Sequence, residues 1–323
     1  MNKRILILCE AIAPPAYSPR IITLVEWLQA HGWHCEIATE MDDDTAWEST
    51  VCKIHQMPTY RRLVADKVLG AKEKAFVKYI QQHIDVNSFD LIFCGSYYYF
   101  PLQAAKRLAE IYRLPLVVDL RDITEQWGKL DYYTRRFTGI QCIDRIAKGI
   151  YTYINTQKRN HVLRGATAVT TVSPWHQRTL AQYNPNTYLI YNGYDANTFY
   201  PKTLVIESFD ITFIGKYYSH YQDCPRLLFA ALQSLIATNQ IAIDEVKVHF
   251  YTNAVGQADF AKLAKEYTLD NVVRVHNYIP RNEIVDRMHH SSIMLVLTTP
   301  IKQYGTHGMM GTKFYEILGV EKP

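Results

Sequence analysis

The residues best suited to chemistry lie near the end of the chain, in the segment Gly308-Met-Met-Gly-Thr-Lys-Phe-Tyr-Glu316. A glycine-containing loop runs here into an expected helix. The backbone amides of Gly311 and Thr312 would be exposed at the helix N-terminus, where phosphate groups bind well. Lys313 would add a positive charge, and Glu316, one turn later, could accept hydrogen bonds from a ribose diol. The pattern indicates a nucleoside-diphosphate site, although many helices begin with Gly-Thr-Lys and bind no phosphate.

Other polar residues directly follow expected strands. Asp119, Arg121 and Asp122 belong to one such loop in the first half of the chain, and Lys216 follows Gly215 after a strand in the second half. Parallel α/β sheets bind ligands at the carboxyl ends of their strands, so these residues are candidates for a site. For Lys216 the alternative is a solvent-exposed loop lysine. Neighbouring loops contribute Arg20, Gly95 and Ser96.

The elements that would position these residues alternate between apolar strands and amphipathic helices, which is typical of α/β folds with doubly wound parallel sheets. The polar stretch Asn192–Pro201, rich in turn formers, interrupts the alternation, and the same rhythm restarts after it. We therefore predict two tandem domains, residues 1–194 and 195–323. The expected strands are Ile5–Leu8, Cys35–Thr39, Leu91–Cys94, Leu116–Asp119, Ala168–Val172, Tyr188–Tyr191, Asp210–Ile214, Val246–Tyr251, Val272–His276 and Ile293–Thr298. The expected helices are Arg20–His31, 61–83, Leu102–Tyr112, 132–164, Pro174–Gln182, Arg226–Leu235, Ala258–Tyr267, Arg281–His289 and Lys313–Leu318.

Several classes of protein lack their motifs here. No Gly-x-Gly-x-x-Gly follows a strand, and no Walker A lysine motif occurs, which argues against dinucleotide-dependent dehydrogenases and P-loop enzymes. No His-Glu-x-x-His or clustered Asp-x-Asp indicates a metal site. No run of about 18 uncharged apolar residues could span a membrane, and the first apolar run is too short for a signal peptide. We expect a cytoplasmic protein with six reduced, structural cysteines and no nucleic-acid partner.

Positive charge is concentrated in residues 132–164, where seven basic residues accompany one acid, Asp144. Apolar residues recur there at three- and four-residue spacing, so the segment reads as a basic amphipathic helix. Such a helix can lie on an anionic membrane surface. The alternative is a surface helix whose apolar stripe faces the core and whose basic face is solvated. The apolar residues are Phe137, Ile140, Ile143, Ile146, Ile150, Tyr153 and Ile154.

Taken together, three motifs resemble retaining glycosyltransferases of family four, which have the GT-B fold of two Rossmann-like domains facing a cleft. They are Asn192-Gly-Tyr-Asp195 with Phe199 and Pro201, the loop Asp119-Leu-Arg-Asp122, and the Gly-Thr-Lys-Phe-Tyr-Glu segment ending at Glu316. The resemblance covers nearly the whole chain, and the stretch at the domain junction is its most specific part.

The resemblance implies that the N-terminal domain binds the acceptor and that the C-terminal domain binds a nucleotide-sugar donor. Lys216, Gly311, Thr312, Lys313 and Glu316 would bind the donor, UDP- or GDP-linked, through its diphosphate and ribose. Asp119, Arg121 and Asp122 would face the reacting sugar as catalytic residues, with Arg20, Gly95 and Ser96 at the acceptor. The implied reaction is metal-independent transfer with retention, needing no cofactor, onto a glycan or lipid-linked acceptor of bacterial surface polysaccharide or glycolipid synthesis. The basic helix would then hold the enzyme on the inner face of the plasma membrane.

The sequence departs from the family pattern at several positions. Gly308 stands where the family usually has a glutamate, and Tyr17-Ser18-Pro19 replaces the usual glycine pair of the N-terminal loop. The family continues beyond the position of Pro323 with a further strand and helices, so we expect the second domain to be incomplete. These departures leave open an inactive nucleotide-binding fragment as one alternative, and the two-domain fold also permits a second one, a nucleotide-sugar epimerase.

Overall fold

The computed structural model describes residues 3–10, 19–40, 51–60, 70–96, 99–127, 139–206, 208–218, 224–298 and 310–323. Its contacts divide the chain into two compact units, unit 1 (Met1–Tyr191) and unit 2 (Asn192–Pro323). Each unit has its own sheet and its own hydrophobic core. What each domain binds stays a prediction.

Unit 1 is built on a parallel sheet of seven described strands in the order β3-β2-β1-β4-β5-β6-β7. Strands β2 and β3 follow β1 on one side of it, and β4 to β7 then follow on its other side, so the strand order reverses at β1. The carboxyl ends of β1, β4 and β5 are adjacent, because Cys9 pairs with Gly95 and Gly95 pairs with Asp119. The strands are β1 (Arg4–Cys9), β2 (His34–Glu40), β3 (Lys53–Met57), β4 (Leu91–Ser96), β5 (Leu116–Leu120), β6 (Ala168–Thr171) and β7 (Thr187–Leu189).

Both faces of this sheet are buried, which explains the nearly continuous apolar strands. In β1 the side chains of Leu6 and Leu8 join the larger core cluster, while Ile5 and Ile7 join the cluster under the first helix. The helices of unit 1 are α1 (Pro19–Ala30), α3 (Ala71–His83), α4 (Leu102–Tyr112), α5 (Gln141–Gly165) and α6 (Pro174–Ala181), with the short 3-10 helices η1 (Val86–Ser88) and η2 (Thr124–Trp127).

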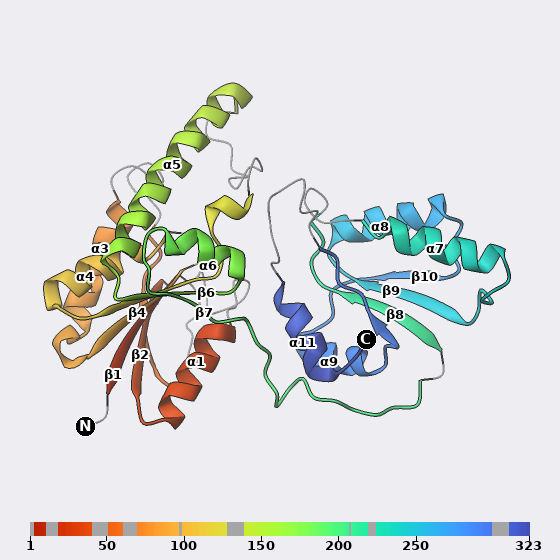
Figure 1. Cartoon of the computed structure of the whole chain (residues 1–323), viewed down its shortest axis with the longest axis horizontal. Helices are drawn as coiled ribbons and strands as arrows, with labels where there is room; N and C mark the ends of the chain where they lie inside the picture. Colours follow the sequence, from red (N-terminus) through yellow and green to blue (C-terminus); the bar gives the residue numbers. More distant parts are fainter. Residues whose placement is uncertain are drawn as a thin grey trace. The chain divides into compact units, whose positions relative to one another are not determined.

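Unit 2 repeats the plan with a parallel sheet of four described strands, in the order β10-β9-β8-β11. Helices α7 and α8 cover one face of the sheet and α9 and α11 lie on the other (Figure 1). The strands are β8 (Phe209–Ile214), β9 (Val246–Tyr251), β10 (Val273–His276) and β11 (Ile293–Met294). The helices are α7 (Arg226–Ala237), α8 (Ala254–Glu266), α9 (Arg281–His289) and α11 (Thr312–Val320).

These two parallel sheets confirm the predicted α/β class, and every predicted strand is present at about its predicted place. The sequence analysis missed β3, because Lys53-Ile-His-Gln-Met has only two apolar residues and pairs on one side, at the edge of the sheet. Of the helix predicted over 61–83, the part after Gly70 is α3, and residues 61–69 lie outside the described residues.

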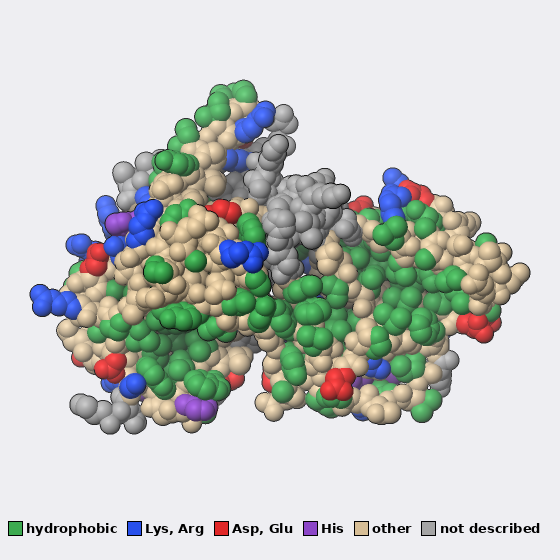
Figure 2. Space-filling model, in the orientation of Figure 1, with side chains coloured by type: hydrophobic (Ala, Val, Ile, Leu, Met, Phe, Trp, Pro, Cys, Tyr) green, Lys and Arg blue, Asp and Glu red, His purple; other side chains and the backbone are tan. Residues whose placement is uncertain are grey.

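The basic segment does form a helix, α5, but its apolar stripe does not face the core. Ile143, Ile146, Ile150 and Tyr153 are between 45% and 66% exposed. The N-terminal half of α5 extends beyond the other helices of unit 1 (Figure 1), and hydrophobic side chains line this extension in Figure 2. The core-facing interpretation is therefore wrong for this half of the helix. Residues 128–138, which include Phe137, lie outside the described residues.

Candidate functional site

The strongest polar contact at the carboxyl edge of unit 1 joins Arg20 to Asp119. Nε and Nη2 of Arg20, in the first turn of α1, donate to the two carboxylate oxygens of Asp119 at 3.0 Å each. The hydroxyl of Thr170 on β6 donates to the same carboxylate at 2.6 Å, and Asp119 is only 1% exposed. Nη1 of Arg20 donates to the carbonyl of Tyr191 at 3.0 Å. Two residues predicted for separate roles thus form one bidentate ion pair that links α1 to β5 and to the end of unit 1.

Gly95 and Ser96, the predicted acceptor residues, end β4 beside this pair. A Cβ on Gly95 would lie 2.7 Å from Cδ1 of Ile21, so the lack of a side chain lets α1 pack closely on the sheet. Ser96 is 3% exposed, and its hydroxyl donates to the carbonyl of Phe100 at 2.9 Å. Both residues have a structural use here, and their contact with an acceptor stays a prediction.

Arg121 and Asp122 follow β5 and are partly buried. Gln126, on η2, donates from its amide nitrogen to Oδ1 of Asp122 at 2.9 Å. Desolvation raises the pKa of the Asp122 carboxyl above its ordinary value, against this hydrogen bond and the charge of Arg121. A carboxyl with a raised pKa is better suited to accepting a proton than an ordinary surface aspartate.

A buried histidine supports the same loop from behind. Nε2 of His176, on α6, lies 3.0 Å from Oε1 of Gln126, an oxygen that also accepts the Ile123 N–H at 3.1 Å. An amide oxygen can only accept, so Nε2 carries the proton and Nδ1 is the bare acceptor. Among the described residues Nδ1 has no hydrogen-bond partner, and the side chain is fully buried. Desolvation lowers the pKa of His176 to about 4, so the ring is neutral near pH 7.

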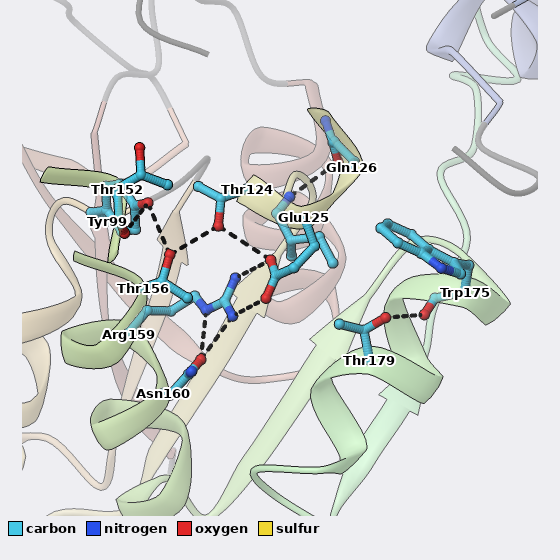
Figure 3. A network of polar contacts seen from close by, with 11 residues as sticks. Tyr99, Thr124, Glu125, Gln126, Thr152, Thr156, Arg159, Asn160, Trp175 and Thr179 are labelled. Atoms are coloured by element: carbon cyan, nitrogen blue, oxygen red, sulfur yellow. Dashed lines mark hydrogen bonds and ion pairs between the residues drawn. The ribbon is translucent and has the colours of Figure 1, made fainter. Parts of the chain in front are cut away.

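A polar network ties η2 to the long helix α5 (Figure 3). Nη1 and Nη2 of Arg159 donate to the two carboxylate oxygens of Glu125 at 2.8 and 2.6 Å, and Nη2 also donates to Oδ1 of Asn160 at 2.7 Å. Arg159 is 1% exposed and is one of the largest fully buried side chains. Despite desolvation, the hydrogen bonds and charge of Arg159 hold the pKa of Glu125 below its ordinary value. The hydroxyls of Thr124 and Thr156 lie 3.1 Å apart and extend the network.

The sequence analysis missed this network entirely. Arg159 counted there as one of the basic residues of the amphipathic segment, and nothing local distinguishes it from the exposed ones. Its partner Glu125 lies 34 residues earlier. Thr170 could have been found only from the sheet register, which places it opposite Asp119.

In unit 2 the loop after β8 is held closely against the start of α8. The backbone N–H of Tyr217 donates to Oδ1 of Asn253 at 2.8 Å. A Cβ on Gly256 would come within 2.9 Å of both Thr252 and Tyr217, so only glycine allows this approach. Lys216 itself is exposed, with Nζ 4.7 Å from the centre of the Tyr218 ring. Its charged end is therefore available to a ligand while its backbone is fixed.

The predicted phosphate and ribose residues form the N-terminus of α11. Gly311 precedes the helix in an extended conformation (φ −65°, ψ 160°), and no side chain of the described residues caps it. The first-turn amides, including those of Thr312 and Lys313, have no partner inside the helix. Nζ of Lys313 donates to Oε2 of Glu316 at 2.5 Å, and Glu316 is 6% exposed. Within the described residues no hydrogen bond reaches Oε1 of Glu316, so this oxygen can still accept.

The Asn-Gly-Tyr-Asp stretch packs on the same helix. Carbons of the Tyr194 ring occupy the space where a Cβ on Gly319 would sit, at 2.5 to 2.9 Å. The carboxylate of Asp195 accepts the Asn197 N–H at 3.0 Å and the Thr198 hydroxyl at 2.6 Å. These bonds shape a turn that places Phe199, which is 2% exposed, in the apolar cluster beside α9 and α11. The most specific motif of the sequence thus supports α11.

Among the described residues there is no group of three or more His, Cys, Asp or Glu side chains that could hold a metal ion. The expectation that no metal takes part remains a prediction. No described helix is long and apolar enough to cross a membrane.

Comparison with known proteins decides the family. The sequence model of Glycosyltransferase Family 4 matches residues 19–198, more than half of the chain. This chain belongs to Glycosyltransferase Family 4. The match includes Arg20, Asp119 and the Asn-Gly-Tyr-Asp stretch, so the predicted family is confirmed. No curated protein matches the sequence of this glycosyltransferase.

Solved structures similar to this glycosyltransferase have the GT-B fold, which confirms the predicted architecture. Sucrose-phosphate synthase from Thermosynechococcus elongatus is 17% identical with a TM-score of 0.59, covering 90% of this chain and 75% of its own. HepE from Anabaena, in complex with UDP, is 14% identical with a TM-score of 0.62, covering 99% and 79%. The lipopolysaccharide outer core galactosyltransferase WaaB is 12% identical with a TM-score of 0.55, covering 92% and 74%.

Proposed function

We propose that this glycosyltransferase transfers a sugar from a nucleoside-diphosphate sugar to a glycan or lipid-linked acceptor, with retention of configuration and without a metal. The N-terminus of α11 carries the proposal. Within the described residues it combines uncapped amides at Thr312 and Lys313, the positive charge of Lys313 and the buried carboxylate of Glu316 within one helical turn. Phosphate oxygens suit the amides and the ammonium group, and a ribose diol suits a carboxylate oxygen.

A ligand at this helix would replace the bond between Lys313 and Glu316 without breaking the fold. The Nζ of Lys313 has three protons and donates one of them to Glu316. A diphosphate can take the remaining donors, while the diol hydroxyls donate to Glu316 in place of the ammonium group. Lys216 is proposed to add charge at the diphosphate. In this proposal, positive groups lower the activation barrier mainly by stabilising the leaving nucleoside diphosphate.

In unit 1 we propose that Arg121 and Asp122 face the reacting sugar, with Asp119 holding Arg20 in place. The raised pKa of Asp122 supports a role in accepting a proton from the acceptor hydroxyl or from a bound phosphate oxygen. Gly95, Ser96 and Arg20 would border the acceptor. A bacterial surface polysaccharide or glycolipid is the proposed product, supported by the similarity in fold to the lipopolysaccharide outer core galactosyltransferase WaaB.

Calorimetric titration of the full chain with UDP and with GDP, without metal, tests the donor site. We expect one of the two to bind. Replacing Glu316 with Ala should weaken binding by about 1–3 kcal/mol, the cost of leaving ribose hydroxyls without their acceptor. Glu321→Gln is the matched control, since Glu321 is exposed and lies just after the same helix. Equal affinity of Glu316→Ala and the parent chain would exclude Glu316 from the site.

The retaining outcome needs a separate measurement. With the nucleotide known, the matching nucleotide sugar and a simple alkyl glycoside acceptor give a product whose anomeric configuration is read by proton NMR. Product with the configuration of the donor supports retention, and the opposite configuration contradicts it. Conversion of the nucleotide sugar to an epimer, with no transfer, would favour the epimerase alternative.

A further inference from the structure

One surface of unit 1 is not explained by nucleotide-sugar chemistry. On α5 five large apolar side chains are exposed: Ile143, Ile146, Ile150, Tyr153 and Ile154, at 42% to 66%. Their spacing of three, four, three and one residues places them on a single side of the helix. We call this set the isoleucine ridge. Isolated exposed apolar residues are ordinary, but a continuous row on one face indicates an interaction surface.

The rest of α5 shows that this orientation is fixed by the fold. Val162 and Leu163, near the end of α5, are fully buried in the main core of unit 1. Arg159 is held by Glu125, and Tyr99 contacts the Thr156 hydroxyl at 3.3 Å. These contacts fix the rotation of the helix about its axis. By helix periodicity the ridge lies on the side opposite to these contacts. Its residues begin in the half of α5 that extends outward (Figure 1).

The charge of α5 selects the kind of partner. Besides the buried Arg159, the helix has four basic residues, Arg145, Lys148, Lys158 and Arg164, and its one acid, Asp144, is 5% exposed. The face of the ridge continues toward the C-terminus of the helix with His161 and Arg164, which are both exposed. The exposed surface of α5 therefore combines apolar and cationic groups and presents no carboxylate. A partner must accept apolar side chains and carry negative charge.

We propose that the isoleucine ridge inserts into the surface of an anionic lipid bilayer, with Lys158 and Arg164, which lie beside it on the helix, at the level of the headgroups. A convex ridge on an extended helix suits a lipid surface, which needs no preformed groove. A second copy of this chain fits less well, because pairing two such helices would bring their positive charges together. The biological role of this membrane binding rests on the proposed function, since a lipid-linked acceptor would lie in the bilayer surface.

Vesicle flotation of the full chain tests the proposal. We expect it to float with vesicles of phosphatidylcholine and phosphatidylglycerol, and far less with phosphatidylcholine alone. The double variant Ile146→Ser, Ile150→Ser should lower the partition coefficient at least about tenfold, since membrane binding scales with the apolar area inserted. Leu227→Ser is the matched control, because Leu227 is 89% exposed on α7 of unit 2 and lies outside the ridge. It should bind as the parent chain does.

The folding state of the double variant, its flotation and its oligomeric state separate lipid binding from the alternatives. Both serine substitutions are at exposed positions, so an unchanged thermal transition of the double variant shows that it is folded. Absence of flotation, or equal flotation of the double variant and the parent chain, would overturn the proposal. A dimer by light scattering that the double variant converts to monomer would overturn it in favour of a second copy. Calorimetry with UDP and GDP on the same samples reports the donor site independently, so failure of lipid binding and failure of nucleotide binding are distinguishable.

Discussion

A double-mutant cycle on Arg159 and Glu125 would measure how strongly α5 is tied to the loop after β5. The two side chains differ in burial: Arg159 is 1% exposed and the Glu125 side chain 30%. Glu125→Gln leaves a guanidinium that cannot lose its proton in a fully buried place, so we expect a cost of about 3–5 kcal/mol. Arg159→Met leaves a carboxylate that water can still reach, so the cost should be smaller, about 1–3 kcal/mol.

The double variant should cost less than the sum of the two single variants. With both charges gone, the Met side chain fills the space of the Arg stem and the Gln side chain can bond to Thr124, which now contacts Glu125 at 3.2 Å. We expect a total of about 2–4 kcal/mol, and therefore a coupling free energy of at least about 2 kcal/mol.

The assay is urea unfolding followed by tryptophan fluorescence. All five tryptophans, at positions 27, 33, 47, 127 and 175, belong to unit 1, so the signal reports the unfolding of that unit alone. A non-additivity below about 0.5 kcal/mol, or a larger loss from Arg159→Met than from Glu125→Gln, would refute the reasoning from burial.

Two further predictions concern His176 and Gly319. The pKa of His176 falls from 6.5 in the unfolded chain to about 4 in the fold, so the unfolded state binds more protons between these values and unit 1 loses stability as pH falls through them. At pH 5 the loss from this residue should be about 2 kcal/mol relative to pH 7, and His176→Gln should remove that part of the slope in urea unfolding; an unchanged slope would contradict it. Gly319→Ala should destabilise unit 2 by about 1–3 kcal/mol, because its Cβ would overlap the Tyr194 ring. In thermal unfolding by circular dichroism the control is Gly193→Ala, where a Cβ meets nothing within 4 Å, and equal effects of the two substitutions would disprove the packing argument.

Hydrophobic pattern was sufficient to find the strands that are buried on both faces, because such strands leave long apolar runs. It failed for β3, whose residues Lys53–Met57 pair only with β2 among the described strands and include three polar residues, Lys53, His55 and Gln56. It also predicted Ile293–Thr298 as a strand where β11 covers only Ile293–Met294. A run of apolar residues indicates burial. The length of the strand, however, depends on how far its backbone pairs with a neighbouring strand, and that neighbour lies elsewhere in the sequence.

The helix α5 marks a second limit. Periodicity showed that Ile143, Ile146 and Ile150 share a face, which the structure confirms, but not whether that face points inward. The direction is set by contacts distant in sequence, above all the ion pair of Arg159 with Glu125 and the burial of Val162. A pattern within one segment carries no information about such contacts.

For the candidate site, the sequence placed the right residues in adjacent loops and could not tell which of them bind each other. Arg20 and Asp119 are 99 residues apart, and their pairing depends on α1 and β5 meeting at one edge of the sheet. Lys313 and Glu316 are three residues apart, so a contact between them follows from helix geometry alone.

The difference between these two ion pairs bears on where a diphosphate is held. Three of the five guanidinium protons of Arg20 are used, two by the buried Asp119 and one by the Tyr191 carbonyl, and the pair links elements that the fold needs together. A phosphate that took these donors would leave Asp119 buried and unpaired, at a cost of several kcal/mol. Lys313 is 32% exposed, uses one proton of three, and pairs with Glu316, whose carboxylate can accept from a ribose diol instead. A phosphate can therefore bind the positive charge at α11 without destabilising the fold, whereas binding to Arg20 would destabilise it. This difference supports α11 as the donor site. Arg20 then mainly shapes the edge of unit 1.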